Sequence, residues 1–187
     1  FPARYEPTAE EAQFPGRVEW KAGQGPRDPP HATLRGPASN PKLEGLFALT
    51  QRVELLPGRQ YVLEFDVRAP FHTPLVAEVC ERHLLYDRSC QGYWQMVPDT
   101  RGAWQHLRLP LRGPALPAAR AYAPRLGMLA LTVPDIGSSV DLANLRLTAG
   151  GGANLLANAD FSAGMARWFP AAQYHFLPWH TDSLYLE

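Results

Sequence analysis

Excess charge of either sign is missing from this 187-residue sequence. Its 18 Lys and Arg residues are balanced by 18 Asp and Glu residues, so the formal net charge at pH 7 is zero. No basic cluster is present, and such a cluster is the usual footprint of a nucleic-acid-binding surface. We therefore expect no nucleic-acid partner.

Long apolar runs are also missing. No stretch reaches the roughly 20 residues that a helix needs to cross a bilayer. No charged region followed by an apolar region marks a secretory signal peptide. The chain begins at Phe1 rather than Met, as a mature product or an excised piece of a longer protein would.

Recognisable catalytic motifs are absent as well. The sequence has no Gly-x-Ser-x-Gly elbow, phosphate-binding loop, His-Glu-x-x-His pair or EF-hand loop. Glu78 with Glu81, or Asp87 with Asp99, could be paired on paper as a glycosidase dyad. Carboxylates on surface turns are far more often solvated than catalytic, so we expect no enzymatic activity and no organic cofactor.

Cysteine is scarce, with only Cys80 and Cys90 in the chain. The two residues flank a polar turn, and this arrangement predicts a hairpin closed by a disulfide, which would contribute roughly 2–3 kcal/mol. A disulfide implies an oxidising compartment, such as the periplasm or the cell exterior. The alternative is two free thiols in a cytosolic protein. A metal site is not favoured, because the spacing is not Cys-x-x-Cys.

The sequence does contain short segments in which apolar and polar residues alternate, as in β-strands, and Pro and Gly turns separate these segments. Apolar and polar side chains alternate through residues 61–68, and residues 127–133 are mostly apolar. Short segments of this kind at about 8–12-residue spacing are typical of an all-β antiparallel sandwich. A phase slip near Ala143 and Asn144 predicts a β-bulge. The expected core includes Leu63, Phe65, Leu107, Leu109, Leu129 and Leu145.

Three segments, in this order, carry a resemblance to a known family. Residues 49–65 read LTQRVELLPGRQYVLEF, residues 104–109 read WQHLRL, and residues 140–147 read VDLANLRL. Together they resemble strands of galactose-binding-like carbohydrate-binding modules. The resemblance implies an antiparallel β-sandwich of jelly-roll type over residues 17–149, preceded by an N-terminal extension over residues 1–16.

The opening phrase of such modules occurs in an unexpected place. Residues 154–168 read NLLANADFSAGMARW, which is similar to the first strand region of jelly-roll carbohydrate-binding modules. Too few residues follow this phrase to build another module. We therefore expect residues 150–187 to form a C-terminal extension.

The end of the chain carries a second resemblance. Residues 177–187, LPWHTDSLYLE, resemble the juxtamembrane region of VanZ-like or O-antigen-ligase-like bacterial membrane proteins. Aromatic residues gather at such membrane interfaces. The resemblance implies an extramembrane domain tethered to a membrane by segments outside this chain. The alternative is a C-terminal strand packed by its aromatic residues.

Tyr93 and Trp94 are the strongest candidates for a binding surface. A sugar ring stacks on an aromatic face because its C–H patches are apolar, and its hydroxyls remain free for polar partners. We predict a glycan site at the hairpin, and its expected polar partners are Arg82, Arg88, Gln91 and Gln95. The alternative is that Trp94 is a buried core residue, as we expect of Trp104.

Asp141 lies in the last of the three family-like segments. Related modules sometimes hold a structural calcium ion at this position, so the resemblance implies such a site here. The acidic partner that usually completes the site near the start of the module cannot be assigned in this sequence.

Two functions of different classes fit these observations. The first is a non-catalytic domain of the cell envelope, periplasmic or extracellular, that binds a glycan such as an envelope polysaccharide. The second is a structural or interaction domain of a membrane protein, with no ligand of its own. A row of aromatic side chains along a concave sheet face would favour the first function, and a flat polar face with every Trp buried would favour the second.

Overall fold

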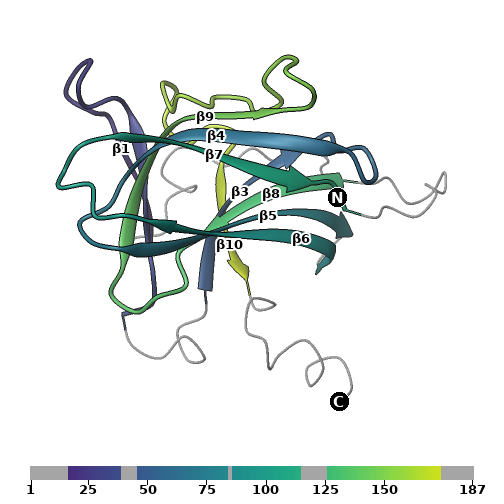
Figure 1. Ribbon diagram of the computed structural model, residues 1–187, viewed down its shortest axis with the longest axis horizontal. Helices are drawn as coiled ribbons and strands as arrows, with labels where there is room; N and C mark the ends of the chain where they lie inside the picture. The colour runs from purple at the N-terminus through teal and green to yellow at the C-terminus, as the bar shows by residue number, and fades with distance from the viewer. Residues whose placement is uncertain (1–16, 39–45, 84–85, 115–125, 174–187) are drawn as a thin grey trace.

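The computed structural model describes residues 17–38, 46–83, 86–114 and 126–173. These residues form ten strands in two five-stranded sheets, and every pairing between neighbouring strands is antiparallel. In Figure 1 the sheets lie as two layers, with β9, β4 and β7 above β3, β8, β5 and β6. The expectation of an all-β antiparallel sandwich of jelly-roll type is confirmed.

The first sheet has the strand order β1-β2-β9-β4-β7. Its strands are β1 (Val18–Lys21), β2 (His31–Arg35), β9 (Ser139–Thr148), β4 (Gln60–Arg68) and β7 (Gln105–Arg112). Neighbours in this sheet are mostly far apart in the sequence, so the sheet forms only when distant segments meet.

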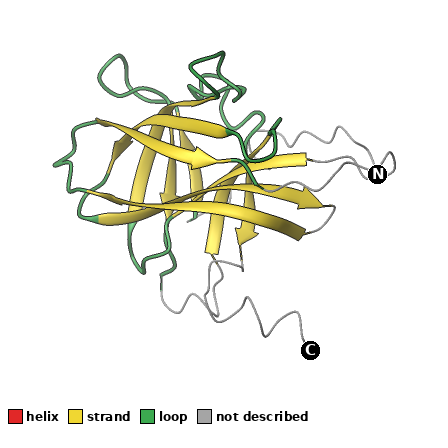
Figure 2. Ribbon diagram, turned by 45° about the vertical axis from the view of Figure 1, so that its right-hand side comes forward, coloured by secondary structure: helices red, strands yellow, loops and turns green. Residues whose placement is uncertain are grey.

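The second sheet has the strand order β10-β3-β8-β5-β6. Its strands are β10 (Phe169–Gln173), β3 (Leu46–Val53), β8 (Leu126–Thr132), β5 (Thr73–His83) and β6 (Tyr86–Val97). The long strands β5 and β6 form a hairpin, and β6 is an edge strand of the sheet. Figure 2 shows the described chain as strands joined by loops.

Side chains of alternating polarity place the core between the sheets. In β4 the residues Tyr61, Leu63, Phe65 and Val67 are buried and the residues between them are half-buried, as the period of two requires. The expected core residues Leu63, Phe65, Leu109, Leu129 and Leu145 are all buried. Leu107 is only partly buried, because β7 lies at the edge of its sheet.

The bulge that the sequence predicts near Ala143 and Asn144 is present. The register between β4 and β9 shifts between Glu64 and Asp66, and Asn144 has a φ of 50°. Asn adopts this left-handed conformation more readily than most residues. The bulge lets Leu142 and Leu145 both reach the core, although they differ in parity along the strand.

The segment after residue 149 packs against the sandwich. Phe161, Met165 and Trp168 are completely buried in the main core cluster. The backbone N–H of Leu145 donates to the carbonyl oxygen of Ala159 at 2.8 Å. Strand β10 then pairs with β3, so the sandwich continues to Gln173 rather than ending at residue 149. We call residues 150–168 the C-terminal strap.

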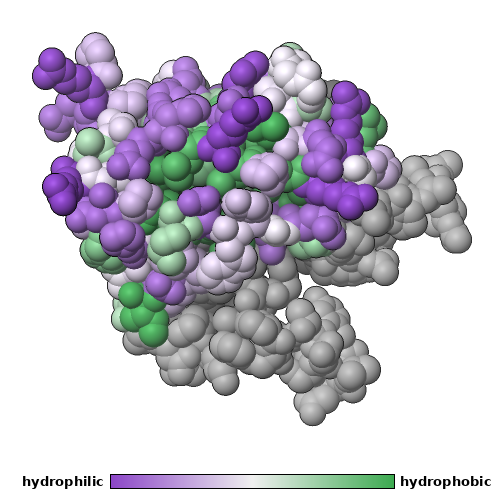
Figure 3. All heavy atoms as spheres, viewed as in Figure 1, coloured by the Kyte–Doolittle hydropathy of each residue, from purple (hydrophilic) through white to green (hydrophobic). Residues whose placement is uncertain are grey.

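Hydrophilic residues cover much of the described surface visible in Figure 3, with apolar areas between them. The part of the chain that the structure describes holds no helix with the length and hydrophobicity needed to span a bilayer. Residues 1–16 and 177–187, for which the sequence predicts an N-terminal extension and a juxtamembrane stretch, lie outside the described residues.

Candidate functional site

The β5–β6 hairpin is closed by a disulfide between Cys80 and Cys90, as the cysteine spacing predicts. The bond lies where the register between the two strands shifts, between Val79 and Glu81. It therefore joins β5 and β6 covalently at the position of the shift.

Adjacent residues of β6 face opposite sides of the sheet. Trp94 points outward, and 62% of its surface is exposed. Tyr93 is partly buried and packs against the core between the sheets. The two rings therefore do not form one platform. Gln91 and Gln95 share the parity of Tyr93, and the Gln95 side chain donates to the carbonyl oxygen of Met96 at 2.7 Å.

Arg82 and Arg88 are placed only by their backbone. Arg82 lies opposite Asp87, and Arg88 lies opposite Glu81, close to the turn of the hairpin. Their side chains lie outside the described part of the structure. Both residues stay predicted as polar partners of a ligand at this end of the hairpin.

The side chains around Trp94 form a distinct surface, which we call the Trp94 face. It consists of Gly92, Trp94 and Met96 from β6 with Val76 and Glu78 from β5, and it lies on the outer side of the second sheet. Met96 is 55% exposed, whereas Val76 and Glu78 are buried. A Cβ at Gly92 would lie 3.0 Å from Oε1 of Glu78, so the glycine makes room for this side chain. The face thus exposes an indole and a thioether, and the Glu78 side chain is buried beside them.

The outer side of the first sheet is different in character, because charged residues pair across its strands. Glu64 lies between Arg108 and Arg146, with nitrogen–oxygen distances of 3.7 and 3.4 Å. Asp66 lies 2.9 Å from Nδ1 of His106. Exposed ion pairs of this kind contribute little to stability, about 0–1 kcal/mol each. Their effect is to keep this side of the sandwich hydrophilic.

Asp141 belongs to the same side and is engaged by three hydrogen bonds. Arg68 donates two of them, at 3.0 and 2.9 Å, and the hydroxyl of Thr33 donates the third at 2.6 Å. The Arg68 guanidinium also lies over the ring of Trp104, 4.5 Å from its centroid. Trp104, expected in the core, is instead half-buried against Arg68 and His31. The reason is its parity, which is that of the outward residues of β7.

Metal binding can be tested against these contacts. A calcium ion at Asp141 would have to displace the Arg68 guanidinium, so the calcium that the family resemblance implies stays a prediction. Among the described residues, Glu78, Cys80 and Cys90 lie close enough together to share an ion. Both sulfur atoms are held in the disulfide, and a metal requires thiolates.

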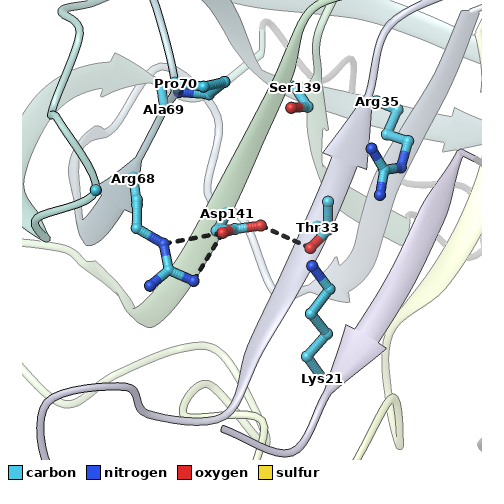
Figure 4. Close-up of a pocket in the computed structure, with 9 residues that line it drawn as sticks. Lys21, Thr33, Arg35, Arg68, Ala69, Pro70, Ser139 and Asp141 are labelled. Carbon is cyan, nitrogen blue, oxygen red and sulfur yellow. Dashed lines mark hydrogen bonds and ion pairs between the residues drawn. The ribbon is translucent and has the colours of Figure 1, made fainter.

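A hollow of about 290 Å³ lies beside Asp141, and sequence reasoning missed it. Figure 4 shows its residues, which come from four strands of the first sheet and the neighbouring loops. We call it the β2–β9 hollow, and it is lined by Lys21, Thr33, Arg35, Arg68, Ala69, Pro70, Gly102, Ser139 and Asp141. No linear motif could reveal it, because its polar residues are the outward positions of strands far apart in the sequence.

Comparison with known proteins places the fold but not the family. A scan against protein-family models found no match, and neither did a search of curated proteins. The chain is similar to the structure of a putative sugar binding protein from Bacteroides thetaiotaomicron, with 14% identity, a TM-score of 0.50, and coverage of 75% of this chain and 84% of that one. It is also similar to the structure of the arabinose-bound α-L-arabinofuranosidase MgGH51, with 14% identity, a TM-score of 0.50, and coverage of 78% and 24%.

A further similar structure is a CBM4 module, with 16% identity, a TM-score of 0.43, and coverage of 72% of this chain and 96% of that one. At such identities a likeness establishes architecture only. The chain has a jelly-roll β-sandwich fold. Its ligand has to be inferred from its own surface.

Proposed function

We propose that this chain is a non-catalytic glycan-binding domain that uses the Trp94 face. The observation that carries the proposal is the exposure of Trp94, an indole with 62% of its surface in contact with solvent on the outer side of a sheet. A large aromatic ring on a rigid strand presents a flat apolar surface at little cost in conformational entropy. Such a surface suits the C–H face of a pyranose ring.

The neighbours of Trp94 enlarge the surface available for stacking. Met96 extends the apolar surface along β6, and the buried Glu78 side chain lies beneath it on the same side of the sheet. Aromatic stacking contributes about 1 kcal/mol beyond area burial. A single ring therefore implies weak binding, with a dissociation constant on the order of 0.1–1 mM.

The disulfide favours an oxidising compartment for this function, the periplasm or the cell exterior. Envelope polysaccharide is the abundant glycan there. Weak binding becomes effective when a domain is held close to its ligand. The proposal therefore includes attachment to a membrane protein of VanZ-like or O-antigen-ligase-like type, through segments outside this chain.

Glycan-array screening followed by titration calorimetry tests the proposal. Trp94→Ala should weaken binding at least tenfold and leave the urea midpoint nearly unchanged, because the ring is exposed. Ile136→Ala is the matched control, since Ile136 is 57% exposed in the loop between β8 and β9. If no glycan binds the unsubstituted protein, the domain is a structural part of a larger protein without a ligand of its own.

A further inference from the structure

The β2–β9 hollow contains an ammonium group that no carboxylate of the described residues pairs with. Arg68 is paired with Asp141 at 2.9 Å and with Asp28 at 3.1 Å. The Lys21 side chain has no hydrogen bond or ion pair within the described ranges. Arg35 contacts Glu19 through one guanidinium nitrogen at 3.5 Å. An ammonium group and the remaining guanidinium donors are therefore available to a ligand.

Sheet register brings these cations to the same point. Lys21 comes from β1 and Arg35 from β2, and in Figure 4 both charged groups point toward Thr33, from opposite sides. Arg35 lies directly opposite Ser139 of β9, so their side chains are neighbours on the outer side of the sheet. The Ser139 hydroxyl has no hydrogen-bond partner in the described part of the chain. The hollow thus offers two cationic donors beside one free hydroxyl.

One wall of the hollow is apolar. Ala69 and Pro70 follow β4 and close the side opposite Arg35, as Figure 4 shows, and Gly102 adds backbone without a side chain. The volume of about 290 Å³ is at the lower end of the range for small-molecule sites. The hollow therefore suits one compact unit that is anionic on one side, apolar on another and hydroxylated between them.

We propose that the β2–β9 hollow binds an acidic sugar, one uronic acid residue at a time, by its carboxylate. Lys21 and Arg35 hold the carboxylate, because ammonium and guanidinium groups form the strongest hydrogen bonds with it. Ser139 bonds a ring hydroxyl, and Pro70 contacts the C–H face of the ring. The choice of a sugar over another carboxylate rests on the proposed glycan-binding function. The anionic preference rests on the hollow alone.

Two-dimensional NMR titration of the whole chain with glucuronate, and with glucose as the uncharged analogue, tests this site. Glucuronate should shift the resonances of Lys21, Arg35 and Ser139 with a dissociation constant of about 1 mM, and glucose should leave them in place. Lys21→Gln and Arg35→Gln should each weaken glucuronate binding about tenfold. Arg108→Gln, an exposed arginine on the same side of the sheet, is the control and should change nothing.

Three results would overturn the assignment. In the first, glucuronate causes no shift at the hollow. In the second, its binding survives Lys21→Gln combined with Arg35→Gln. In the third, inorganic sulfate at equal ionic strength binds as tightly as glucuronate, which would mean an anion site without sugar recognition. Neutral glycans tested on Trp94→Ala report on the proposed function separately, so either idea can fail without the other.

Discussion

Trp94 and Trp168 show how differently one side chain can be used in this sandwich. Trp168 is completely buried in the strap, and its indole N–H donates to the carbonyl oxygen of Asn158 at 2.9 Å. Its ring lies 5.4 Å from that of Phe161. Trp94 is exposed at the edge of the second sheet. Stability should therefore depend on the first residue and binding on the second.

Trp168→Ala should destabilise the protein by about 3–5 kcal/mol, because it removes a large buried ring and leaves a cavity. Urea unfolding followed by fluorescence or circular dichroism measures the loss. Trp94→Ala serves as the comparison, with an expected change of less than about 0.5 kcal/mol. Equal effects of the two substitutions would show that the strap does not pack as described.

Asp160 gives a prediction about pH. The backbone N–H and the hydroxyl of Ser162 both donate to its carboxylate, at 3.1 and 2.8 Å, and they hold the pKa of Asp160 below its ordinary value. The charged form is thus favoured in the folded state. Its stabilising effect is present above the unfolded-state pKa and is lost as pH falls through the folded-state pKa.

NMR titration of the Asp160 carboxyl carbon should accordingly give a pKa below the model-peptide value of about 3.9. Ser162→Ala removes the hydroxyl donor and should move this pKa upward, while the backbone donor remains. An identical titration curve in both proteins would mean that the hydroxyl contact does not form in solution.

Residue roles were the hardest part to predict from the sequence. The disulfide partners followed from their number and spacing. The prediction that Tyr93 and Trp94 belong to one binding surface was wrong, because neighbouring strand residues face opposite sides and only the register decides which side is outward. No sequence pattern marks Lys21 and Arg35 as binding residues. The two side chains come together only when their strands pair in the folded sheet.

At the scale of elements, the β5–β6 hairpin depends on its disulfide. Replacing Cys80 and Cys90 together by Ser should lower the free energy of unfolding by about 2–3 kcal/mol, because the unfolded chain regains the entropy of the open loop. Urea unfolding of the double variant measures this loss. Intact-mass analysis after alkylation should find no free thiol in the unreduced parent protein, and two reactive thiols there would contradict the bond.

Elements with a strong period were predictable, and short edge elements were not. The alternation in β4 and the phase slip in β9 are both visible in the sequence. Strand β10 is only five residues long and contains Pro170, which an edge strand tolerates and which conceals the strand pattern. The strap has no alternation because its residues reach the core from turns rather than from a strand.

At the scale of the whole molecule, the domain needs the strap to complete its hydrophobic core. A chain ending at residue 149 would lack Leu156, Phe161, Met165 and Trp168, all of which are buried in the main core. We expect such a truncation to bind the dye ANS and to lose cooperative unfolding, because it exposes the apolar surface that these residues cover. A chain ending at Gln173 should unfold cooperatively. Equal cooperativity of the two truncations would show that the sandwich is complete without the strap.

The overall architecture was open to prediction because many short alternating segments between turns have few ways to hide their apolar faces. The position of residues 154–168, which resemble the opening of jelly-roll carbohydrate-binding modules, could not be predicted in the same way. Several apolar residues of this segment, Leu156, Phe161, Met165 and Trp168, are buried in the main core. The local sequence indicates which residues of a segment are buried. The rest of the chain determines which element they pack against.

The strap also joins the two ends of the sandwich, and this has a consequence for how the chain folds. The indole N–H of Trp20 donates to the carbonyl oxygen of Phe161 in the strap, 141 residues later. Just after the strap, the carbonyl oxygen of Phe169 accepts a hydrogen bond from the Thr50 hydroxyl. Contacts between residues so far apart in the sequence make folding slow, on the order of milliseconds to seconds, because long loops must close before the contacts form. A nascent chain therefore cannot complete its core until nearly all of the described sequence has been synthesised. Until then its apolar surface stays exposed, which is the condition under which incomplete chains aggregate.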